Sequence, residues 1–570
     1  MTDKIQTKKW VTYPKINTTA EEELSEYPAF FRQLLFNRGI TTAAEAQAFL
    51  SADIELADPF LLIGLEKAVV RLLEAVRAEE LIVIYGDYDV DGVTATALMV
   101  EVLHSIGGRV EPYIPNRFDE GYGLNEDAVV MLATQRGAKV ILTVDCGIRS
   151  PHEAQVAKSL GVDLIISDHH FPQGELPDGY AVICPKQEGD AYPYKDLAGV
   201  GVAYKISQGI FILNGMDVRK ADEWLDLVAL GTVADMLPLT GENRSMVKKG
   251  LVRIQSGSRT GLTALAGAAG KNIRKTSSSD IGYILGPRLN AAGRMESAQQ
   301  AYQLLVSTSV EEAGRSAQVL DNHNTERQKA TRLAQEKAQL SIADPAELKL
   351  ITSFDAEYSS GIVGLVASKL VEKFYRPAIV GEILEDTIRA SCRSIPGFHI
   401  TKALDECSDL LVRHGGHEMA AGFTVRLEMV DALTARLQQI AARELADKDL
   451  RQRINADLEW DLASIRPKDY EWLEKLQPTG MSNASPLFIS RGNKLEQLRV
   501  MGKEGTHLQF SVHGCAIGRA VAFNQGHWYQ TWFEEKPRFD LVYSIEVNQF
   551  MGTETLQLNI RDMKISAIGF

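Results

Sequence analysis

Cysteines are scarce in the 570-residue sequence, and their spacing excludes two kinds of cysteine-based site. The five cysteines stand at positions 146, 184, 392, 407 and 515 and form no C-x-x-C pair. Such spacing indicates neither a zinc knuckle nor a disulfide framework. We therefore expect buried free thiols in a reducing compartment.

Long apolar runs are also absent. None approaches the roughly 18 residues of a membrane-spanning helix. The opening residues M-T-D-K-I-Q-T-K-K-W lack the apolar core of a signal peptide. The sequence therefore predicts a soluble, cytoplasmic protein that has no membrane partner.

Two phosphate-binding motifs are missing as well. The P-loop pattern G-x-x-x-x-G-K-[ST] does not occur, because Gly270–Lys271 is followed by Asn272. The run G-V-G at 199–201 lacks the third glycine of a dinucleotide-binding motif, since Tyr204 stands in its place. P-loop nucleotide hydrolases and dinucleotide-binding enzymes are therefore excluded.

The length of the chain limits the number of domains, and its net charge limits the class of protein. A chain of 570 residues exceeds the usual size of one core, so three to five domains of about 100 to 200 residues are expected. The formal net charge of -14 argues against a wholly basic protein that coats nucleic acid. It leaves room for a local basic groove in an acidic body.

The most informative stretch runs from residue 81 to residue 97 and reads L-I-V-I-Y-G-D-Y-D-V-D-G-V-T-A-T-A. Its apolar start is short and rich in β-branched residues, which favours a buried strand that ends near Gly86. Three aspartates at alternate positions would share one side of an extended segment, and they would repel unless cations neutralise them. The stretch therefore predicts a metal site at a strand end, formed by Asp87, Asp89 and Asp91.

Two other interpretations of this stretch exist. A calcium-binding EF-hand loop would need glutamate at its twelfth position, where this sequence has Leu98, and the stretch follows a strand. A solvated acidic turn stays open from these residues alone, because aspartate and glycine are common in turns.

Helix and strand patterns alternate from residue 68 onward, as in a parallel sheet flanked by helices. We expect strands at 81–85, 109–114, 140–144 and 162–167, and helices at 68–78, 93–105, 126–135 and 151–160. Ligands bind at the carboxyl ends of the strands in such sheets. Polar residues follow two more of these strands, as Asp145-Cys146-Gly147 and Asp168-His169-His170, and Asp235 is a further strand-end candidate after the apolar run 225–230.

These strand ends offer carboxylate oxygens and one or two imidazoles. Such a set suits Mn²⁺ or Mg²⁺ better than a metal that prefers thiolates. The carboxylates outnumber what one octahedral ion with bound waters would need, so two ions are plausible. From the residues alone, the function that follows is phosphoester hydrolysis.

The order of motifs resembles the DHH phosphoesterase superfamily and, within it, the bacterial single-strand-specific exonucleases. Tyr85 stands where many superfamily members have a histidine, and the extra Asp87 is typical of the exonuclease branch. The resemblance rests on all motifs together, since each one alone is common. They are G-D-Y-D-V-D-G at 86–92, P-N-R-F at 115–118, G-Y-G-L at 121–124, V-D-C-G at 144–147, S-D-H-H at 167–170, A-D-M at 234–236, G-P-R-L-N-A-A-G-R at 286–294 and G-G-H-E-M-A-A-G-F-T at 415–424.

The resemblance implies a centre with two Mn²⁺ or Mg²⁺ ions. The implied ligands are Asp89, Asp91, Asp145, His169 and Asp235. Asp145 would bridge the ions, and Asp87 would lie at or near the shell of ligands. Asp168 would orient a histidine, and His170 would touch the scissile phosphate or the leaving oxygen.

Residues 346–445 resemble the DHH-associated domain through three motifs. They are G-I-V-G at 361–364, R-A-S-C-R-S at 389–394 and H-G-G-H at 414–417. Glycines let a backbone approach a phosphate closely, and arginines bind its oxygens as a fork. By resemblance, a terminal 5′ phosphate would be held by Ser391 and Arg393, with Arg288 or Arg294 across the cleft. We expect the other substrate-binding residues to be Arg117, Asn290, Arg327 and His417.

A long helix and a terminal barrel are expected beyond the metal site. Residues 311–342 contain one glycine and no proline, which predicts a helix that joins two lobes. Its run 320–328 resembles the helix along the exonuclease groove, and a merely solvated face is the alternative. Five short strands near the C-terminus fit an OB-like barrel, which binds single strands by stacking bases on aromatic residues. Aromatic candidates, which could also be core residues, are Phe510, Phe523, Trp528 and Trp532.

The chain is thus predicted to have an α/β fold in five segments. They are an N-terminal helical segment (1–60), a DHH catalytic domain with a parallel sheet (61–270), a helical connector with the long linking helix (271–343), an α/β DHH-associated domain (344–450) and a C-terminal OB-fold domain (451–570).

The resemblance implies a function in DNA repair and recombination. We expect a monomeric, metal-dependent 5′-to-3′ exonuclease that hydrolyses single-stranded DNA to mononucleotides and works with a helicase and a single-strand-binding protein. One alternative is a short-oligonucleotide or cyclic-dinucleotide phosphodiesterase, against which the long helix and the barrel speak. The other is a non-catalytic DNA-binding replication scaffold, against which the complete set of acidic ligands speaks.

Overall fold

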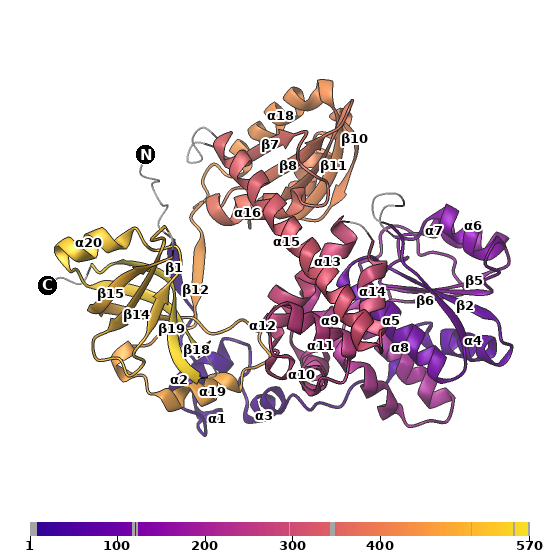
Figure 1. Cartoon of the computed structure of the whole chain (residues 1–570), viewed down its shortest axis with the longest axis horizontal. Coiled ribbons are helices and arrows are strands. Elements are labelled where there is room, and N and C mark those ends of the chain that lie inside the picture. Colours follow the sequence, from indigo (N-terminus) through magenta and orange to yellow (C-terminus); the bar gives the residue numbers. More distant parts are fainter. Residues whose placement is uncertain are drawn as a thin grey trace.

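The computed structural model consists of three lobes, and one long helix connects the first two (Figure 1). It describes residues 8–116, 120, 123–295, 297–342, 348–502, 504–550 and 553–567. Each lobe contains its own sheet. Within those ranges, no helix combines the length and the apolar character needed to cross a membrane.

The first lobe is built on a five-stranded parallel sheet in the order β3-β2-β4-β5-β6. Its strands are β2 (Leu81–Gly86), β3 (Arg109–Tyr113), β4 (Val140–Val144), β5 (Asp163–Ser167) and β6 (Ala181–Ile183). Its connecting helices are α4 (Leu65–Arg77), α5 (Val90–Ser105), α6 (Glu126–Thr134) and α7 (Pro151–Ser159). Alternate residues of β2 pack into apolar clusters on opposite faces of the sheet. Burial on both faces explains why this strand is continuously apolar, and the predicted alternation is confirmed.

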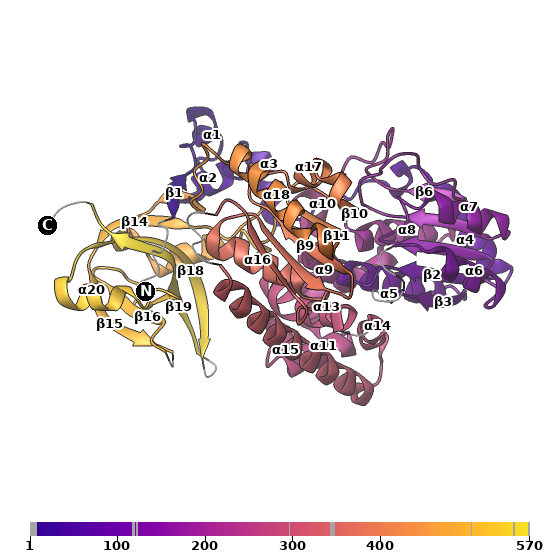
Figure 2. The same cartoon turned by 90° about the horizontal axis from the view of Figure 1, so that it is seen from above.

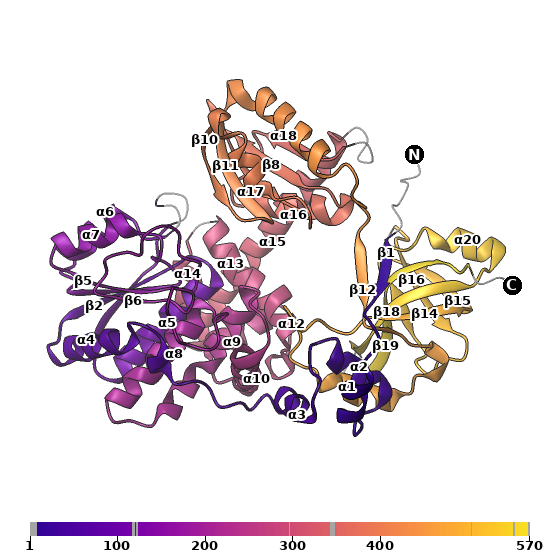
Figure 3. The same cartoon turned by 180° about the vertical axis from the view of Figure 1, so that it is seen from behind.

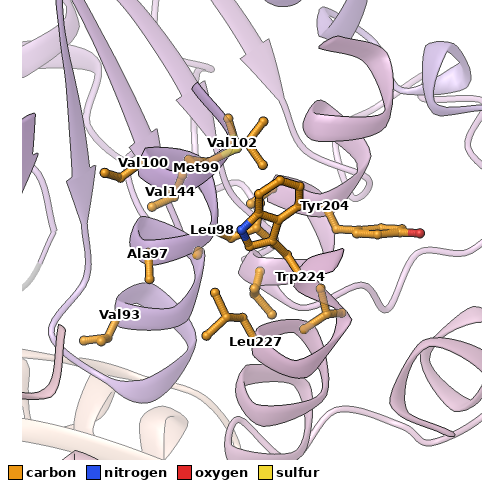
Figure 4. Close-up of a cluster of buried hydrophobic side chains, with 14 of the residues drawn as sticks. Val93, Ala97, Leu98, Met99, Val100, Val102, Val144, Tyr204, Trp224 and Leu227 are labelled. Atoms are coloured by element: carbon orange, nitrogen blue, oxygen red, sulfur yellow. The ribbon is translucent and has the colours of Figure 1, made fainter. Parts of the chain in front are cut away.

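The apolar core of the first lobe continues into a helical layer. Figure 4 shows the Trp224 ring near Leu98, Tyr204 and Leu227. The indole N–H of Trp224 donates a hydrogen bond to Glu101 Oε2 at 2.7 Å, which satisfies its polar edge. The helices that pack with α5 in this layer include α8 (Gly199–Leu213), α9 (Leu225–Ala234) and α14 (Gln299–Val306), and α10 (Gly241–Ser256) packs on α9.

One predicted strand proves to be a helix. The apolar run 225–230 belongs to α9, and Asp235 is the C-cap of that helix rather than the end of a strand. Residues 225–232 are all buried. An apolar run that is buried on every side carries no periodicity that separates a strand from a helix, which explains the error.

The long helix α15 (Val310–Leu340) links the first lobe to the second (Figure 2). Ala313 and Leu320 in its N-terminal half belong to the core of the first lobe. Ala334 and Ala338 in its C-terminal half pack in the second lobe. The predicted linking helix is therefore confirmed, and it is anchored at both ends.

The second lobe has a mixed five-stranded sheet in the order β10-β11-β9-β8-β7. Its strands are β7 (Ile351–Asp355), β8 (Ala378–Ile383), β9 (Thr387–Arg393), β10 (Leu411–Gly416) and β11 (Ala420–Arg426). Its helices are α16 (Val363–Phe374), α17 (Ile400–Asp405) and α18 (Val430–Glu444). The strand β9 is central, and Arg393 at its end pairs with Ala378 and Ala420. This pairing fixes the backbone from which Arg393 projects.

The third lobe is a seven-stranded sheet around one apolar core. Its strands are β13 (Leu458–Glu459), β14 (Phe488–Asn493), β15 (Leu495–Met501), β16 (His507–Val512), β17 (Ala520–Ala522), β18 (Phe539–Phe550) and β19 (Thr553–Ile565). Phe510 is a buried core residue, whereas Phe523 is exposed. Trp528 and Trp532 lie in helix α20 (Trp528–Glu535) instead of in strands.

The N-terminal segment packs on this third lobe (Figure 3). It comprises β1 (Lys9–Thr12), α1 (Thr18–Glu23), α2 (Ala29–Phe36) and α3 (Ala43–Ser51). The strand β1 pairs in parallel with β12 (Arg453–Ala456). Phe31 and Leu34 share an apolar core with Phe488. The two ends of the described chain therefore form one structural unit.

Arg244 of α10 connects the third lobe to the first through hydrogen bonds. Its side chain is almost fully buried, and its N–H groups reach backbone carbonyls from both terminal segments. These carbonyl acceptors, at 2.8 to 3.0 Å, belong to Phe49, Leu476, Gln477 and Pro478. A buried guanidinium needs such partners, so the segment 476–478 is held on the first lobe.

Candidate metal centre and substrate groove

The stretch 87–91 leaves the buried strand β2 and enters α5. Asp89 is the N-cap of this helix, and its Oδ1 accepts hydrogen bonds from the backbone N–H groups of Asp91 at 2.9 Å and Gly92 at 3.1 Å. Asp91 already lies in the first helical turn. The three aspartates are therefore not aligned along an extended segment, and the helix start sets their directions.

The carboxylate of Asp91 lies at the N-terminus of α8. Its Oδ2 accepts a hydrogen bond from the N–H of Gly199 at 2.6 Å, and its Oδ1 accepts one from Val200 at 2.8 Å. Both donors belong to a first helical turn, whose partial positive charge favours a carboxylate. Burial raises the pKa of Asp91 to about 7, the charge of Asp89 adds to this, and the two amides oppose it.

Asp145 follows β4 directly and has a left-handed backbone conformation, with φ at +65°. Such a conformation is uncommon for residues other than glycine and clusters at functional sites. The side chain is buried. Burial and the charge of Asp91 raise the pKa of Asp145 well above its usual value. A carboxylate in this position is costly without a nearby cation.

His169 follows the neighbouring strand β5 and lies among three carboxylates. Its Nε2 is 3.0 Å from Asp145 Oδ1, 3.6 Å from Asp235 Oδ2 and 3.8 Å from Asp91 Oδ2. Burial and the charge of His170 lower the pKa of His169 to about 3. The imidazole is therefore neutral near pH 7, which is the form that ligates metals.

The potential ligand atoms form three overlapping sets, each within 4.8 Å. Asp145 and His169 each belong to two of these sets. Two ions that share a carboxylate are typical of phosphoryl-transfer centres. The sets are Asp91-His169-Asp235, Asp145-His169-His170 and Asp87-Asp89-Asp145.

Two atoms of this cluster test whether a divalent cation fits. Asp145 Oδ1 and His169 Nε2 are buried, and apart from their 3.0 Å contact with each other neither has a hydrogen-bond partner among the described residues. A buried polar atom without a partner is unfavourable, and a cation would satisfy both atoms. Oxygen donors with one imidazole are suited to Mn²⁺ or Mg²⁺. The residues therefore fit the predicted ions.

Asp168 organises the segment that carries the two histidines. Its Oδ1 accepts the backbone N–H groups of His169 at 2.7 Å and His170 at 3.0 Å, and it lies 2.7 Å from His170 Nδ1. Its Oδ2 accepts the N–H of Ile148 at 3.0 Å. Burial opposes its charge, but His170 and these amides outweigh burial and lower the pKa of Asp168 to about 2. Burial lowers the pKa of His170, but the hydrogen bond to Asp168 outweighs burial, so the pKa of His170 is raised overall.

Gly199 is a position where an added side chain would disturb the centre directly. A Cβ atom there would lie 2.6 Å from the Asp145 Cβ and 2.7 Å from its Oδ1. We expect Gly199→Ala to displace this carboxylate and to lower metal-dependent hydrolysis by about 10- to 100-fold, as when the residues around metal ligands are disturbed. An activity assay and a calorimetric Mn²⁺ titration would measure the effect.

Gly201→Ala is the matched control for this prediction. Gly201 lies in the same helix, and a Cβ there would meet only the Leu197 side chain, at 3.4 Å or more. Both substitutions gain the same intrinsic helix propensity. Equal activity and equal Mn²⁺ affinity in the two variants would contradict the steric role of Gly199.

Helix α13 (Gly286–Met295) connects this centre to the second lobe. The Oδ1 atom of Asn290, a predicted substrate contact, accepts the N–H of Val90 at 3.2 Å, so this residue supports the start of α5. The Nη1 atom of Arg294 donates to the carbonyl of Gly361 at 3.2 Å, just before α16. The loop of aspartates and the start of α16 therefore contact the same helix.

Ser391 and Arg393 lie against the first turn of α16. Arg393 Nη1 donates to Ser391 Oγ at 3.0 Å and to the Cys392 carbonyl at 2.8 Å. A Cβ atom on Gly364 would lie 3.0 Å from Arg393 Nη2, so the glycine lets the helix start approach the guanidinium. A guanidinium beside a helix N-terminus suits a phosphate.

The other predicted substrate residues are dispersed. Arg288 forms an ion pair with Asp321 at 2.8 Å, and Arg327 Nη2 donates to Asn324 Oδ1 at 2.8 Å. His417 is exposed in the turn between β10 and β11. Arg117 lies outside the described residues.

A cavity of about 1030 Å³ is lined by the residues on both sides of Asp235 in the sequence, Ala234 and Met236. Residues from the end of α9, α15, α16, the segment 479–487 and β19 line it, so all three lobes contribute. Four cationic side chains and one acidic side chain, Glu372, are among the lining residues. The cationic side chains are Arg327, Arg332, Lys369 and Arg561. We call this space the central groove.

Sequence reasoning did not predict the part played by Gly199 and Val200. The run G-V-G at 199–201, which fails as a dinucleotide-binding motif, is the helix start that receives Asp91. The two glycines of this run were the available signal, since glycine allows close approach to another group.

Family models match three parts of the chain. They are the DHH family N-terminal domain at 81–232, the DHHA1 domain at 347–443 and the RecJ OB domain at 456–562. The first contains all of the predicted metal ligands except Asp235.

Several relatives align over nearly the whole chain. The single-stranded-DNA-specific exonuclease RecJ of Bacillus subtilis is 40% identical over 538 residues, which cover 94% of this chain and 67% of the relative. The protein of the same name from Dickeya dadantii is 35% identical, with 97% of this chain and 99% of the relative covered. The protein of the same name from Escherichia coli is 34% identical, and the alignment covers 94% of this chain and 96% of the relative.

Solved structures agree with these alignments. The crystal structure of RecJ from Thermus thermophilus in complex with Mn²⁺ matches with a TM-score of 0.85 at 29% identity, and the match covers 98% of this chain and 79% of that chain. The structure of the same protein with Mg²⁺ matches with a TM-score of 0.78 at 27% identity, covering 98% and 78%. On its sequence, its domains and its fold, the chain belongs to the RecJ family.

Proposed function

We propose that this chain hydrolyses single-stranded DNA from its 5′ end and releases mononucleotides. The observation that carries the proposal is the cluster of aspartate and histidine ligand atoms beside the cation-lined central groove. Relatives named as single-stranded-DNA-specific exonucleases support the substrate. The 5′-phosphate site that the resemblance assigns to Ser391 and Arg393 supports the polarity.

The metal ions of this proposal are Mn²⁺ or Mg²⁺. Bound here, they would polarise the phosphoryl oxygens and lower the pKa of bound water. The solved RecJ complexes with Mn²⁺ and with Mg²⁺ support this choice. The residues that would hold them are Asp89, Asp91, Asp145, His169 and Asp235, with Asp87 at their edge.

His170 and Asp168 would act on the phosphate rather than on the ions. Asp168 accepts a hydrogen bond from Nδ1 of His170 and raises the pKa of this histidine. The ring is thereby fixed, and its protonated form is favoured. His170 Nε2 would then donate a proton or a hydrogen bond to the leaving oxygen, as general acids do.

Linear and circular strands test the proposed exonuclease directly. We expect rapid hydrolysis of linear single strands with Mn²⁺ and no hydrolysis of covalently closed single-stranded circles, which have no end. A blunt duplex should also resist, because the bases that enter the central groove must be unpaired. Cleavage of the circle would make the protein an endonuclease and overturn the proposal.

Arg393 is expected to recognise the 5′ phosphate. Arg393→Ala should reduce kcat/KM on 5′-phosphorylated strands, since a charge-assisted hydrogen bond is worth about 1.5 to 3 kcal/mol, or roughly 10- to 150-fold. The loss on 5′-hydroxyl strands should be much smaller. Steady-state kinetics on both substrates would measure the difference.

Arg426→Ala is the matched control for Arg393. Arg426 is exposed and lies on β11 opposite Thr387, at the far end of the strand pair from Arg393. Its removal should affect both substrates equally and slightly. If Arg393→Ala reduced activity on both substrates by the same factor, Arg393 would not be the phosphate contact.

The rival function of a short-oligonucleotide or cyclic-dinucleotide phosphodiesterase makes a different prediction. Such an enzyme would not need a groove that connects three lobes, and it would favour the shortest substrates. Rates that rise with strand length favour the exonuclease. A helicase, a single-strand-binding protein and a monomeric state stay predictions.

A further inference from the structure

Three large apolar side chains are exposed inside the central groove. The exposed fractions are 83% for Tyr283, 65% for Met236 and 45% for Met481, and all three residues line the same cavity. Single exposed apolar side chains are ordinary, but several that gather in one cavity mark an interaction site. We call these three residues the apolar step.

Irregular backbone presents two of these side chains. Tyr283 lies in a π-helical turn, Ile281–Leu285, between short helix α12 (Ser278–Asp280) and α13. Met236 has a left-handed conformation with φ at +60°, which is uncommon for a residue of its size. Both features are found preferentially at functional sites.

The apolar step adjoins a predicted metal ligand. The π-helical turn packs on the end of α9, because a Cβ atom on Gly282 would lie 3.8 Å from Val233 and one on Gly286 would lie 3.4 Å from Ala234. Asp235 and Met236 are the next two residues. The Met481 carbonyl accepts the N–H of Leu239, which fixes the third member of the step.

The charge around the apolar step selects the class of ligand. Four cationic residues and one acidic residue are named among the lining residues, although the whole chain carries a net charge of -14. Arg332, Lys369 and Arg561 pair with Glu336, Glu372 and Glu546, whereas Arg327 has no ion pair among the described residues. Cationic side chains around one exposed aromatic ring match a polyanion with flat apolar groups, which is the chemistry of a single nucleic-acid strand. An apolar protein segment would not need the cations.

We propose that the apolar step is a base-binding site, in which Tyr283 stacks on a nucleobase of the strand while Met236 and Met481 contact its neighbours. The site would hold the strand in register with the metal centre and would require the bases to be unpaired. This inference rests on the proposed function. It adds the residues that contact the bases near the reaction.

Abasic nucleotides test the stacking contact. A set of single strands would each carry one abasic nucleotide at a successive position, and their binding to the full-length protein would be measured in EDTA to prevent hydrolysis. Besides any positions that stack on the third lobe, we expect for the wild type one or two adjacent positions where the abasic nucleotide weakens binding by about 5- to 150-fold, the range of one stacked base. With Tyr283→Ala, the abasic nucleotide at that position should have no further effect.

Two variants control this experiment. Tyr283→Phe retains the ring and should keep the position dependence of the wild type. Tyr13→Ala removes an exposed tyrosine outside the central groove and should change nothing. Because Tyr283 is largely exposed, Tyr283→Ala should also unfold at the wild-type temperature.

The outcomes separate this inference from the proposed function. If the wild type degrades single strands but Tyr283→Ala keeps the same position dependence, the base-binding site is wrong and the exonuclease stands. If the wild type neither binds nor degrades single strands, both are wrong. Capture of a protein partner by Tyr283 in place of DNA would likewise appear as an abasic series that Tyr283→Ala leaves unchanged.

Discussion

Asp145→Asn is expected to abolish metal-dependent hydrolysis while single-stranded DNA still binds. Asp145 belongs to two of the three sets of ligand atoms, so its loss removes a charged ligand atom from both sets. Metal ions contribute several kcal/mol to phosphoryl transfer, and about 4 kcal/mol corresponds to a thousandfold lower rate. DNA binding depends on cations and aromatic residues elsewhere, so its affinity in EDTA should remain near the wild-type value.

Thermal unfolding gives a second measurement for Asp145→Asn. Mn²⁺ should raise the unfolding temperature of the wild type, because a ligand of the native state stabilises it, and this rise should be much smaller in the variant. Asp178→Asn is the matched control, since Asp178 is exposed and contacts only Lys158 among the ion pairs of the described residues. A variant at Asp145 with near-normal turnover would contradict the site assignment.

A fragment of residues 53–446 is expected to separate catalysis from strand binding. All predicted metal ligands lie within it, whereas the aromatic candidates and the third lobe do not. We expect it to cut short oligonucleotides but to bind long strands at least about 100-fold more weakly, because each stacked base contributes about 1 to 3 kcal/mol. Binding titrations against strands of increasing length would measure this.

The N-terminal segment must be removed together with the third lobe. Phe31 and Leu34 pack into the core of that lobe, so removal of the C-terminal part alone would expose them to water. In a fragment of residues 53–446, Arg244 would lose its carbonyl partners in 476–478 and that of Phe49 but would gain water. A fragment that begins at residue 53 contains neither Phe31 nor Leu34, so it avoids the exposure of their apolar side chains, which is the larger of the two costs.

Salt dependence provides the decisive readout for this fragment. Each phosphate contact that is lost should lower the slope of log affinity against log salt by roughly 0.7 for a single strand. A folded fragment with the affinity and the salt slope of the whole chain would show that the third lobe does not bind the strand.

The sheet and its polar strand ends could be predicted because they follow local patterns. The strand β2 is short, apolar and β-branched, and its neighbours repeat this pattern between helical segments. Parallel connections then place the carboxyl ends of the strands along one edge. Asp145 and His169 therefore meet as the sequence indicates, at 3.0 Å.

Contacts between distant parts of the chain could not be predicted in this way. Asp91 receives its hydrogen bonds from Gly199 and Val200, more than a hundred residues further on. Asn290 supports the N–H of Val90 across 200 residues. Such pairings depend on how elements pack, and no local period or propensity encodes them.

The type of a polar residue alone could not show whether it contacts the substrate or another part of the protein. Asn290 and Arg288, which the resemblance assigns to the substrate, also contact Val90 and Asp321 within the protein. Polar residues in a groove serve both the substrate and the protein, and only their partners distinguish these uses.

Labelled single strands test the central claim most directly. One preparation would carry a label at its 5′ end and another at its 3′ end, and both would be digested with Mn²⁺ and sampled over time. We predict that the 5′ label appears at once as a mononucleotide, while the 3′ label stays on strands that shorten progressively. Early release of the 3′ label as a mononucleotide, or internal fragments from either strand, would contradict a 5′-to-3′ exonuclease.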